Sequence, residues 1–193
     1  MQTDNKSPNM DSELVKRLQA GELKAFDELF EQYRSGILAY VIGITHDRGI
    51  AEEITQDCFL ALVKHRDRLN PRRSVSGWLY RVARNRAIDV MRHRKFEVLP
   101  GDEYLDVQNE EGGDVPMPES ALVQKEERQA LLDAMHILSD REKELLMLRF
   151  RGDLTFKEIS EVVKRPLGTV LWSTRRALAK LREKLEGGHD YDM

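Results

Sequence analysis

The sequence predicts an all-α protein with two small helical domains joined by a flexible acidic linker. Apolar residues recur at three- and four-residue spacing in both halves of the chain, which is the period of an amphipathic helix. Between the halves, residues 97–119 hold eight acidic side chains, no basic one and three prolines. Such a stretch buries too little apolar surface to fold alone and is longer than most loops, so we expect domains at residues 1–96 and 120–193.

Composition and charge narrow the class of protein. With 40% hydrophobic and 34% charged residues and no apolar run of the roughly eighteen residues that a membrane span needs, we expect a cytoplasmic protein without membrane insertion. One cysteine, Cys58, excludes an internal disulfide, and the five histidines lack ligand spacing, so no metal or other cofactor is expected. Residues 1–96 carry 17 basic and 13 acidic side chains and residues 120–193 carry 14 and 13, so both domains are mildly basic despite the net charge of −3.

The first domain is expected to be a helical bundle. A short helix at residues 11–19 precedes a longer one that begins at Glu22. The apolar face of the longer helix comprises Leu23, Phe26, Leu29, Phe30, Tyr33, Ile37, Leu38, Val41 and Ile44. A third helix at residues 50–66 turns Ile54, Cys58 and Leu62 inward, which favours a core residue over a redox-sensing thiol at position 58. Its outward side carries Glu53, Gln56 and Asp57.

A basic helix at residues 78–95 follows, with six Arg or Lys and a single acid. One side carries Leu79, Ala83, Ala87 and Val90, and a polar stripe opposite carries Arg81, Asn85, Asp89 and Arg92. This pattern suits either a nucleic-acid-reading face or a solvated surface. The Trp78 ring at the entrance is interpreted mainly as a core anchor.

The loop at residues 69–77 leads into that helix and is rich in basic and hydroxyl side chains. Arg72 and Arg73 could hold phosphate, and Asn70, Ser74 and Ser76 could bond to the edges of an unstacked base. The alternative is an ordinary surface turn.

The sequence of the second domain predicts three or four helices. The first covers residues 120–138, and the capping boxes Ser139 to Glu142 and Thr155 to Glu158 begin the next two. A break at residues 164–166 precedes a basic helix at residues 167–185. Two helices joined by a tight turn favour a helix-turn-helix over a plain bundle.

Five motifs together resemble the extracytoplasmic-function sigma factors of bacterial RNA polymerase, within the sigma-70 family. They are AEEITQDCF (51–59), WLYRVARNRAID (78–89), LSDRE (138–142), FKEIS (156–160) and LGTV (167–170) with Arg176 and Ala177. The resemblance implies a region 2 domain at residues 1–96, which binds the polymerase clamp helices and opens the minus-10 element. It also implies a region 4 domain at residues 120–193, which reads the minus-35 element and binds the flap of the second polymerase subunit.

The resemblance also assigns roles to residues. The clamp contact falls on Glu53, Gln56 and Asp57. The minus-10 contacts fall on Asn70, Arg72, Arg73, Ser74, Ser76, Arg81, Asn85 and Arg92, with Asn85 at the centre. The minus-35 contacts fall on Thr169, Trp172, Ser173, Arg175, Arg176 and Lys180. An anti-sigma factor that holds the protein inactive is a further partner that the family implies, and the acidic linker would run toward the RNA exit path.

The chain departs from the family at Leu171 and Trp172, where polar or basic residues are usual. Three explanations stay open: apolar contact with a thymine methyl, phosphate binding by Arg175, Arg176 and Lys180, or an inward-packed Trp172. No phosphate loop, metal cluster or nucleophile-base pair points to an enzyme. The competing function is a free-standing helix-turn-helix regulator that acts without polymerase.

Overall fold

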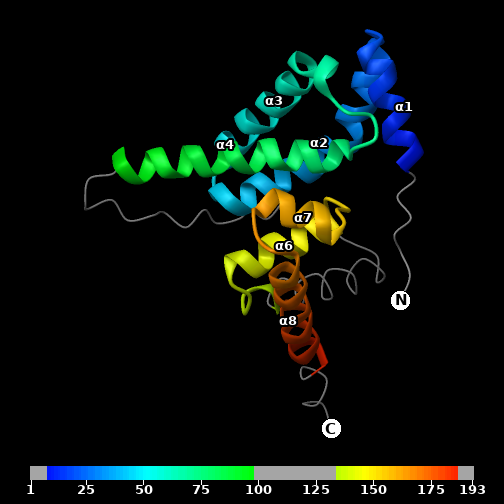
Figure 1. Cartoon of the computed structure of the whole chain (residues 1–193). Helices are drawn as coiled ribbons and strands as arrows, with labels where there is room; N and C mark the ends of the chain where they lie inside the picture. The colour runs from blue at the N-terminus through cyan, green and yellow to red at the C-terminus, as the bar shows by residue number, and fades with distance from the viewer. Residues whose placement is uncertain (1–7, 98–133, 187–193) are drawn as a thin grey trace, which may run out of the picture.

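The computed structural model describes residues 8–97 and 134–186, and every regular element in these ranges is a helix. The N-terminal lobe contains α1 (Pro8–Gln19), α2 (Leu23–Thr45), α3 (Arg48–Lys64), the short 3-10 helix η1 (Arg66–Arg68) and α4 (Val75–Glu97). The C-terminal lobe contains α6 (Asp140–Phe150), α7 (Phe156–Val163) and α8 (Leu167–Glu186). Figure 1 shows the long α4 between α3 on one side and the C-terminal lobe on the other. The all-α prediction is therefore confirmed for the described residues.

The N-terminal lobe is a bundle in which α2, α3 and α4 pack on one another. The predicted inward side chains of α3, Ile54, Cys58 and Leu62, are all buried. Burial raises the pKa of the Cys58 thiol to about 12, so it is protonated at neutral pH and acts as a small core residue. The first helix is held by a buried hydrogen bond of 2.6 Å from the Tyr33 hydroxyl to the Asp11 carboxylate.

The C-terminal lobe owes its helix boundaries to local signals. Ser139 and Thr155 each accept a hydrogen bond from a backbone amide three residues on, and Glu142 and Glu158 complete the two capping boxes. Lys164 has a left-handed backbone with φ of 55°, and its amide donates a hydrogen bond to the Ser160 carbonyl, which ends α7 and directs the chain into α8. The predicted helix-turn-helix is thus formed by α7 and α8.

The two lobes lie in contact. Helix α7 packs on α4, and α6 packs on α2. Buried side chains of both lobes, including Leu79 and Tyr80 of α4 and Leu148 and Leu154 of the C-terminal lobe, belong to one continuous hydrophobic core. A second, smaller core of the C-terminal lobe lies between α6 and α8.

The structure differs from the sequence-based expectations at the start of α2 and at the start of α4. Leu23 was expected on the apolar face of α2 but is 81% exposed, because it is the first residue of the helix and lies beyond its packed part. Helix α4 begins at Val75, within the predicted loop, because the Ser74 hydroxyl accepts a hydrogen bond of 3.0 Å from the Gly77 amide. Glu97, the first residue of the predicted linker, is the last residue of α4. The rest of that linker, and the predicted helix at 120–138 up to residue 133, lie outside the described residues.

Candidate nucleic-acid interface

The polar stripe of α4 is present as predicted, opposite a buried face. Leu79, Ala83 and Ala87 are fully buried, whereas Asn85 and Arg92 are exposed. Arg92 lies 3.3 Å from Asp89 in an exposed ion pair, and such a pair contributes little stability. The free carboxamide of Asn85 offers both a donor and an acceptor in the middle of this surface.

The loop before α4 presents its charged side chains to solvent. Arg72 and Arg73 are exposed, so their guanidinium groups are accessible to phosphate. The Asn70 side-chain oxygen accepts a hydrogen bond of 2.9 Å from the Arg72 amide, which fixes the turn. Ser74 is half-buried and caps α4.

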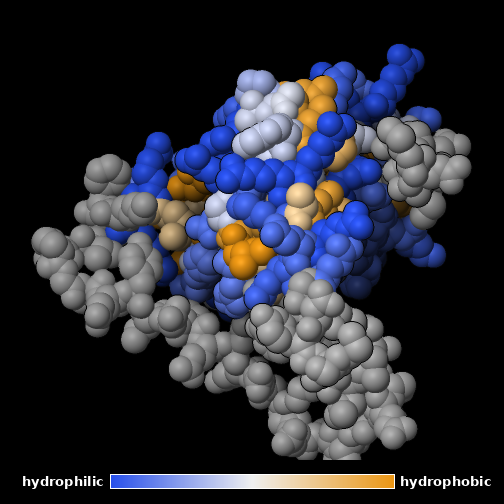
Figure 2. All heavy atoms as spheres, turned by 90° about the horizontal axis from the view of Figure 1, so that it is seen from below, coloured by the Kyte–Doolittle hydropathy of each residue, from blue (hydrophilic) through white to orange (hydrophobic). Residues whose placement is uncertain are grey.

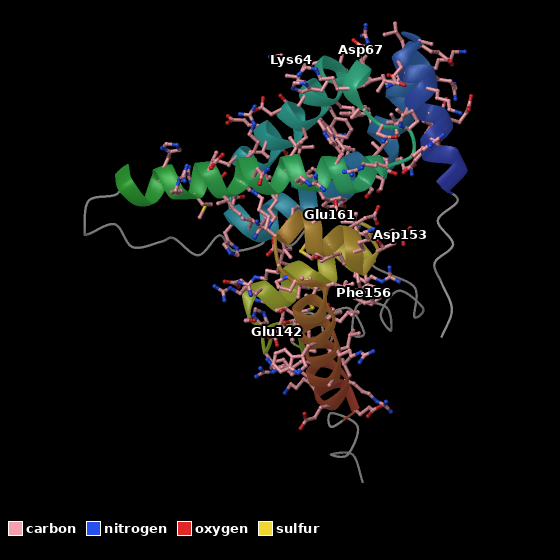
Figure 3. The ribbon with its side chains drawn as sticks, viewed as in Figure 1. Lys64, Asp67, Glu142, Asp153, Phe156 and Glu161 are labelled. Carbon is pink, nitrogen blue, oxygen red and sulfur yellow. The ribbon has the colours of Figure 1, made fainter. Side chains whose placement is uncertain are left out.

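Two residues of the predicted minus-10 set contact the C-terminal lobe instead of solvent. Ser76 is 1% exposed, and its hydroxyl donates a hydrogen bond of 2.8 Å to the Gly152 carbonyl. Arg81 donates a hydrogen bond of 2.9 Å to the carboxylate of Glu161, which Figure 3 labels on α7 next to α4. In this conformation Ser76 is unavailable to a nucleotide and Arg81 is partly neutralised.

The outward face of α3 carries the predicted clamp residues. Glu53, Gln56 and Asp57 are exposed, and Asp57 lies 3.6 Å from Arg86 of α4. Sequence reasoning missed Leu60, which is 67% exposed one helical turn beyond Gln56. An apolar side chain on an otherwise acidic and polar helix face was the available signal.

Helix α8 presents an open face near its N-terminus. Thr169, Trp172, Arg175 and Arg176 are exposed, and Ser173 is half-buried. The Trp172 ring is 61% exposed, which excludes the inward-packed explanation, and the Arg176 guanidinium lies over it at 5.3 Å from the ring centroid. Figure 2, which views the molecule from below, shows a surface that is mostly hydrophilic with separate hydrophobic patches.

Lys180, one turn beyond Arg176, is held by the protein itself. Its ammonium donates hydrogen bonds of 2.8 and 2.9 Å to the two carboxylate oxygens of Glu142, the residue labelled in Figure 3 on α6. These hydrogen bonds, with those from Ser139, lower the pKa of Glu142 to about 2. Glu142 therefore joins the cap of α6 to α8, a link that sequence alone did not predict.

An open cleft of about 230 Å³ lies beside this face of α8. Thr169, Trp172 and Arg176 line one side, and Arg84 of α4 reaches the cleft from the other lobe. Basic side chains also come from Arg141 and Arg165. Two acids, Glu142 and Glu144, line the cleft as well, so the four arginines leave it with an excess of basic side chains, which suits phosphate binding.

No group of three or more His, Cys, Asp or Glu side chains within residues 8–97 and 134–186 could hold a metal ion. Nor is any helix of this described part long and apolar enough to cross a membrane.

Each of the two lobes matches a known protein family. Residues 29–97 match the family model for sigma-70 region 2, and residues 134–183 match that for sigma-70 region 4. The chain is 29% identical over 179 residues to the ECF RNA polymerase sigma factor SigW of Bacillus subtilis, covering 89% of this chain and 94% of SigW. It is 31% identical over 175 residues to the ECF RNA polymerase sigma factor BldN of Streptomyces coelicolor, covering 88% of this chain and 64% of BldN.

Two solved structures share the fold. The sigma factor RpoE in complex with the anti-sigma factor NepR, from Bartonella quintana, aligns with a TM-score of 0.61 at 20% identity, covering 84% of this chain and 98% of RpoE. CnrH in complex with the cytosolic domain of CnrY aligns with a TM-score of 0.58 at 18% identity, covering 92% and 97%. The matches to regions 2 and 4, in order and over more than half of the residues, show that this chain belongs to the sigma-70 family as an extracytoplasmic-function sigma factor.

Proposed function

We propose that this chain, an alternative sigma factor that directs RNA polymerase to promoters, binds its partners through three separate surfaces. Helix α3 docks on the clamp helices of the polymerase, α4 and its preceding loop capture the minus-10 element, and α8 reads the minus-35 element. The observation that carries the proposal is the exposure of two separate basic reading elements, around Asn85 and around Arg176, in one chain with an acidic face on α3. The protein acts in the cytoplasm, and all catalysis belongs to the polymerase.

The clamp contact uses charge and one apolar anchor. Glu53, Gln56 and Asp57 face solvent on α3 and suit a basic partner surface. Leu60 supplies an apolar side chain that becomes buried on docking. This face is formed without any residue of the C-terminal lobe.

The minus-10 contact centres on Asn85. Its exposed carboxamide can pair with a base edge, while Arg72 and Arg73 hold the backbone of the displaced strand. An extruded base would enter the loop near Asn70 and Ser74. Unstacking of that base is then favoured by a pocket and needs no fuel.

The minus-35 contact uses an aromatic side chain in place of the usual polar ones. Trp172 presents an apolar face that suits the methyl group of thymine, and Arg176 stacked on it is held in position for a base or phosphate. Because Lys180 is bound to Glu142, phosphate contacts fall mainly to Arg175 and Arg176.

An anti-sigma factor is a further proposed partner. The related fold of RpoE was solved in complex with the anti-sigma factor NepR, and such an inhibitor would keep this chain from polymerase until a signal releases it. The C-terminal lobe would also bind the polymerase directly, at the flap of its second subunit.

A run-off transcription assay tests the function. Promoter DNA is selected by the holoenzyme and sequenced, and transcripts are then measured with the chain alone, with core polymerase alone and with both. We expect RNA from the promoter only when both are present. A free-standing helix-turn-helix regulator would instead bind the duplex tightly by itself, with no transcription gained from the added chain.

A further inference from the structure

We propose that Gln19 of α1 is a positioning residue for minus-10 recognition: its side-chain amide fixes the start of the loop before α4 and thereby sets which base that loop accepts. The inference rests on the proposed function of this loop as the site of the extruded base. Gln19 lies outside the loop, 50 residues before Leu69 in the sequence. Its effect on the promoter is therefore exerted through the backbone of the loop.

The Gln19 carboxamide binds two backbone carbonyl groups. Its Nε2 donates hydrogen bonds of 2.9 Å to the Arg66 carbonyl and 2.9 Å to the Leu69 carbonyl. A side-chain amide nitrogen carries two hydrogens, so both donors are used at once. The Leu69 amide also donates a hydrogen bond of 3.1 Å to the Arg66 carbonyl. Gln19 therefore ties the first residue of η1 to the residue that follows η1.

The tied residue directly precedes a proposed base contact. The Leu69 side chain is buried in the hydrophobic core, whereas Asn70, the next residue, is exposed. The peptide group between them is planar, so a fixed Leu69 carbonyl also fixes the direction of the Asn70 amide. Gln19 thus sets the orientation in which Asn70 leaves the bundle.

Bonds within the loop set its shape but not its direction. The Asn70 side-chain oxygen accepts a hydrogen bond of 2.9 Å from the Arg72 amide, and the Arg73 amide donates one of 2.9 Å to the Asn70 carbonyl. Both bonds lie within residues 70–73 and turn with the loop as a unit. At the first end of the loop, its direction relative to the bundle is set by Gln19 and by the buried Leu69 side chain.

Helix α1 is itself fixed to the bundle, so it holds Gln19 in place. Near one end, the Asp11 carboxylate accepts the buried hydrogen bond from Tyr33 of α2. Near the other end, the Arg17 guanidinium donates a hydrogen bond of 2.9 Å to Glu28 of α2. Figure 1 shows α1 beside the segment that joins α3 to α4, and α1 contacts η1 in that segment. The loop is therefore braced from α2 through α1.

A braced loop favours one base over the others. A loop already ordered in its bound shape loses less conformational freedom when a base enters. Its hydrogen-bonding groups also keep one geometry, whereas a loop that turns freely would adapt to several bases. Loss of the Gln19 hydrogen bonds should thus slow promoter opening and weaken the preference for one base at one promoter position.

The experiment measures base preference in the full chain bound to core polymerase. Promoters selected by the holoenzyme are made with each of the four bases at each minus-10 position, and opening is followed by 2-aminopurine fluorescence at a fixed neighbouring site. Base preference is the ratio of the fastest to the slowest opening rate at one position. Asn70→Ala identifies the position read by the loop, and Asn85→Ala identifies the position read by α4. The folded fraction of a variant cancels in this ratio.

Three substitutions of Gln19 separate its donors from its size and charge. Gln19→Glu and Gln19→Met remove both donors, with and without a charge, and Gln19→Lys keeps donors that reach the same carbonyls. We expect the first two to lower base preference at the Asn70 position by about threefold to tenfold, the factor that follows from losing ordinary hydrogen bonds. Preference at the Asn85 position should be unchanged, and Gln19→Lys should retain most of the native preference at both positions.

Gln32→Ala is the matched control, because it removes another side-chain amide that links α1 to α2 without touching the loop. It should alter base preference at neither position. Unchanged preference in both Gln19→Glu and Gln19→Met would overturn the proposal. Equal losses at the Asn70 and Asn85 positions would also overturn it, since Gln19 would then only stabilise the domain.

Two further outcomes decide the role of the donors and of the loop. A loss in Gln19→Lys as large as in Gln19→Glu would overturn the proposal, because the donors would not matter. So would a native chain that opens the promoter while Asn70→Ala changes base preference at no position, because the loop would then read no base. Failure of the native chain to open any promoter with core polymerase would instead refute the proposed function.

Discussion

Helices α4 and α8 are both assigned to promoter DNA, yet the structure presents them differently. On α8 the reading side chains Trp172, Arg175 and Arg176 lie open to solvent. On α4 the stripe is divided, with Asn85 and Arg92 exposed but Ser76 and Arg81 bonded to the C-terminal lobe. The proposed minus-35 surface is therefore accessible in this conformation, whereas part of the proposed minus-10 surface is covered.

This difference has a physical origin in what each helix packs against. The buried side of α8 meets α6 and α7 of its own lobe, and its opposite side carries the exposed Trp172, Arg175 and Arg176. The buried side of α4 meets α2 and α3, and a second side meets α7. A helix with neighbours on two sides keeps only part of its polar face for a ligand.

The largest expected effect comes from the core that the lobes share. Leu154→Ala removes a fully buried side chain packed against α4 and should lower the free energy of unfolding by about 2–5 kcal/mol. Leu178→Ala, at a site 40% exposed on α8, should change it by less than about 0.5 kcal/mol. Urea denaturation measures both. A loss at Leu154 no larger than at Leu178 would contradict a shared core.

The next effect separates α4 from α3. Asn85→Ala removes the donor and acceptor proposed to read a minus-10 base, so promoter opening should fall by about tenfold to a hundredfold while polymerase binding is unchanged. Asp57→Ala should show the opposite pattern. Fluorescence polarisation with core polymerase and 2-aminopurine opening kinetics distinguish them. Equal losses of binding and opening in the Asn85 variant would show that α4 acts in docking.

A smaller effect concerns the open face of α8. If Trp172 contacts a thymine methyl, replacing thymine by uracil at one minus-35 position should weaken holoenzyme binding by about threefold to tenfold. Trp172→Ala should make the holoenzyme insensitive to that replacement, and Leu178→Ala serves as a control on the same helix. Sensitivity to uracil that survives in Trp172→Ala would assign the contact elsewhere.

The smallest effect is a pH dependence within the C-terminal lobe. The pKa of Glu142 is lowered from 4.5 to about 2 in the folded protein, mainly by the hydrogen bond from Lys180. The ionised carboxylate therefore stabilises the fold above pH 4.5, and this contribution is lost as the pH falls from 4.5 toward 2. Glu142→Gln should show a weaker decline in unfolding free energy over that range. An identical decline in both proteins would remove Glu142 from the account.

Local signals in the sequence were sufficient to predict most elements. The capping boxes at Ser139 and Thr155 and the break at residues 164–166 predicted the ends of α6, α7 and α8 because each signal acts within four residues. The start of α4 was missed because Gly77 suggested a loop, although Ser74 is a suitable cap.

Contacts between distant residues could not be predicted in the same way. Ser76 looked like a loop hydroxyl, and its partner Gly152 lies 76 residues further along the chain. Lys180 looked like a phosphate contact, and its partner Glu142 lies 38 residues away. The periodicity that indicates which side of a helix is polar does not indicate which neighbour will cover it. The assignment of Asn85 as the centre of the reading surface does not depend on such a contact.

The distance between the lobes in solution tests the account most directly. In the Cys58→Ala background, Glu31→Cys on α2 and Glu183→Cys on α8 place a donor and an acceptor dye on exposed sites of the two lobes. The account predicts high energy transfer in the free chain and a large fall when core polymerase and promoter DNA are added. Low transfer in the free chain, or high transfer that persists in the open promoter complex, would contradict it.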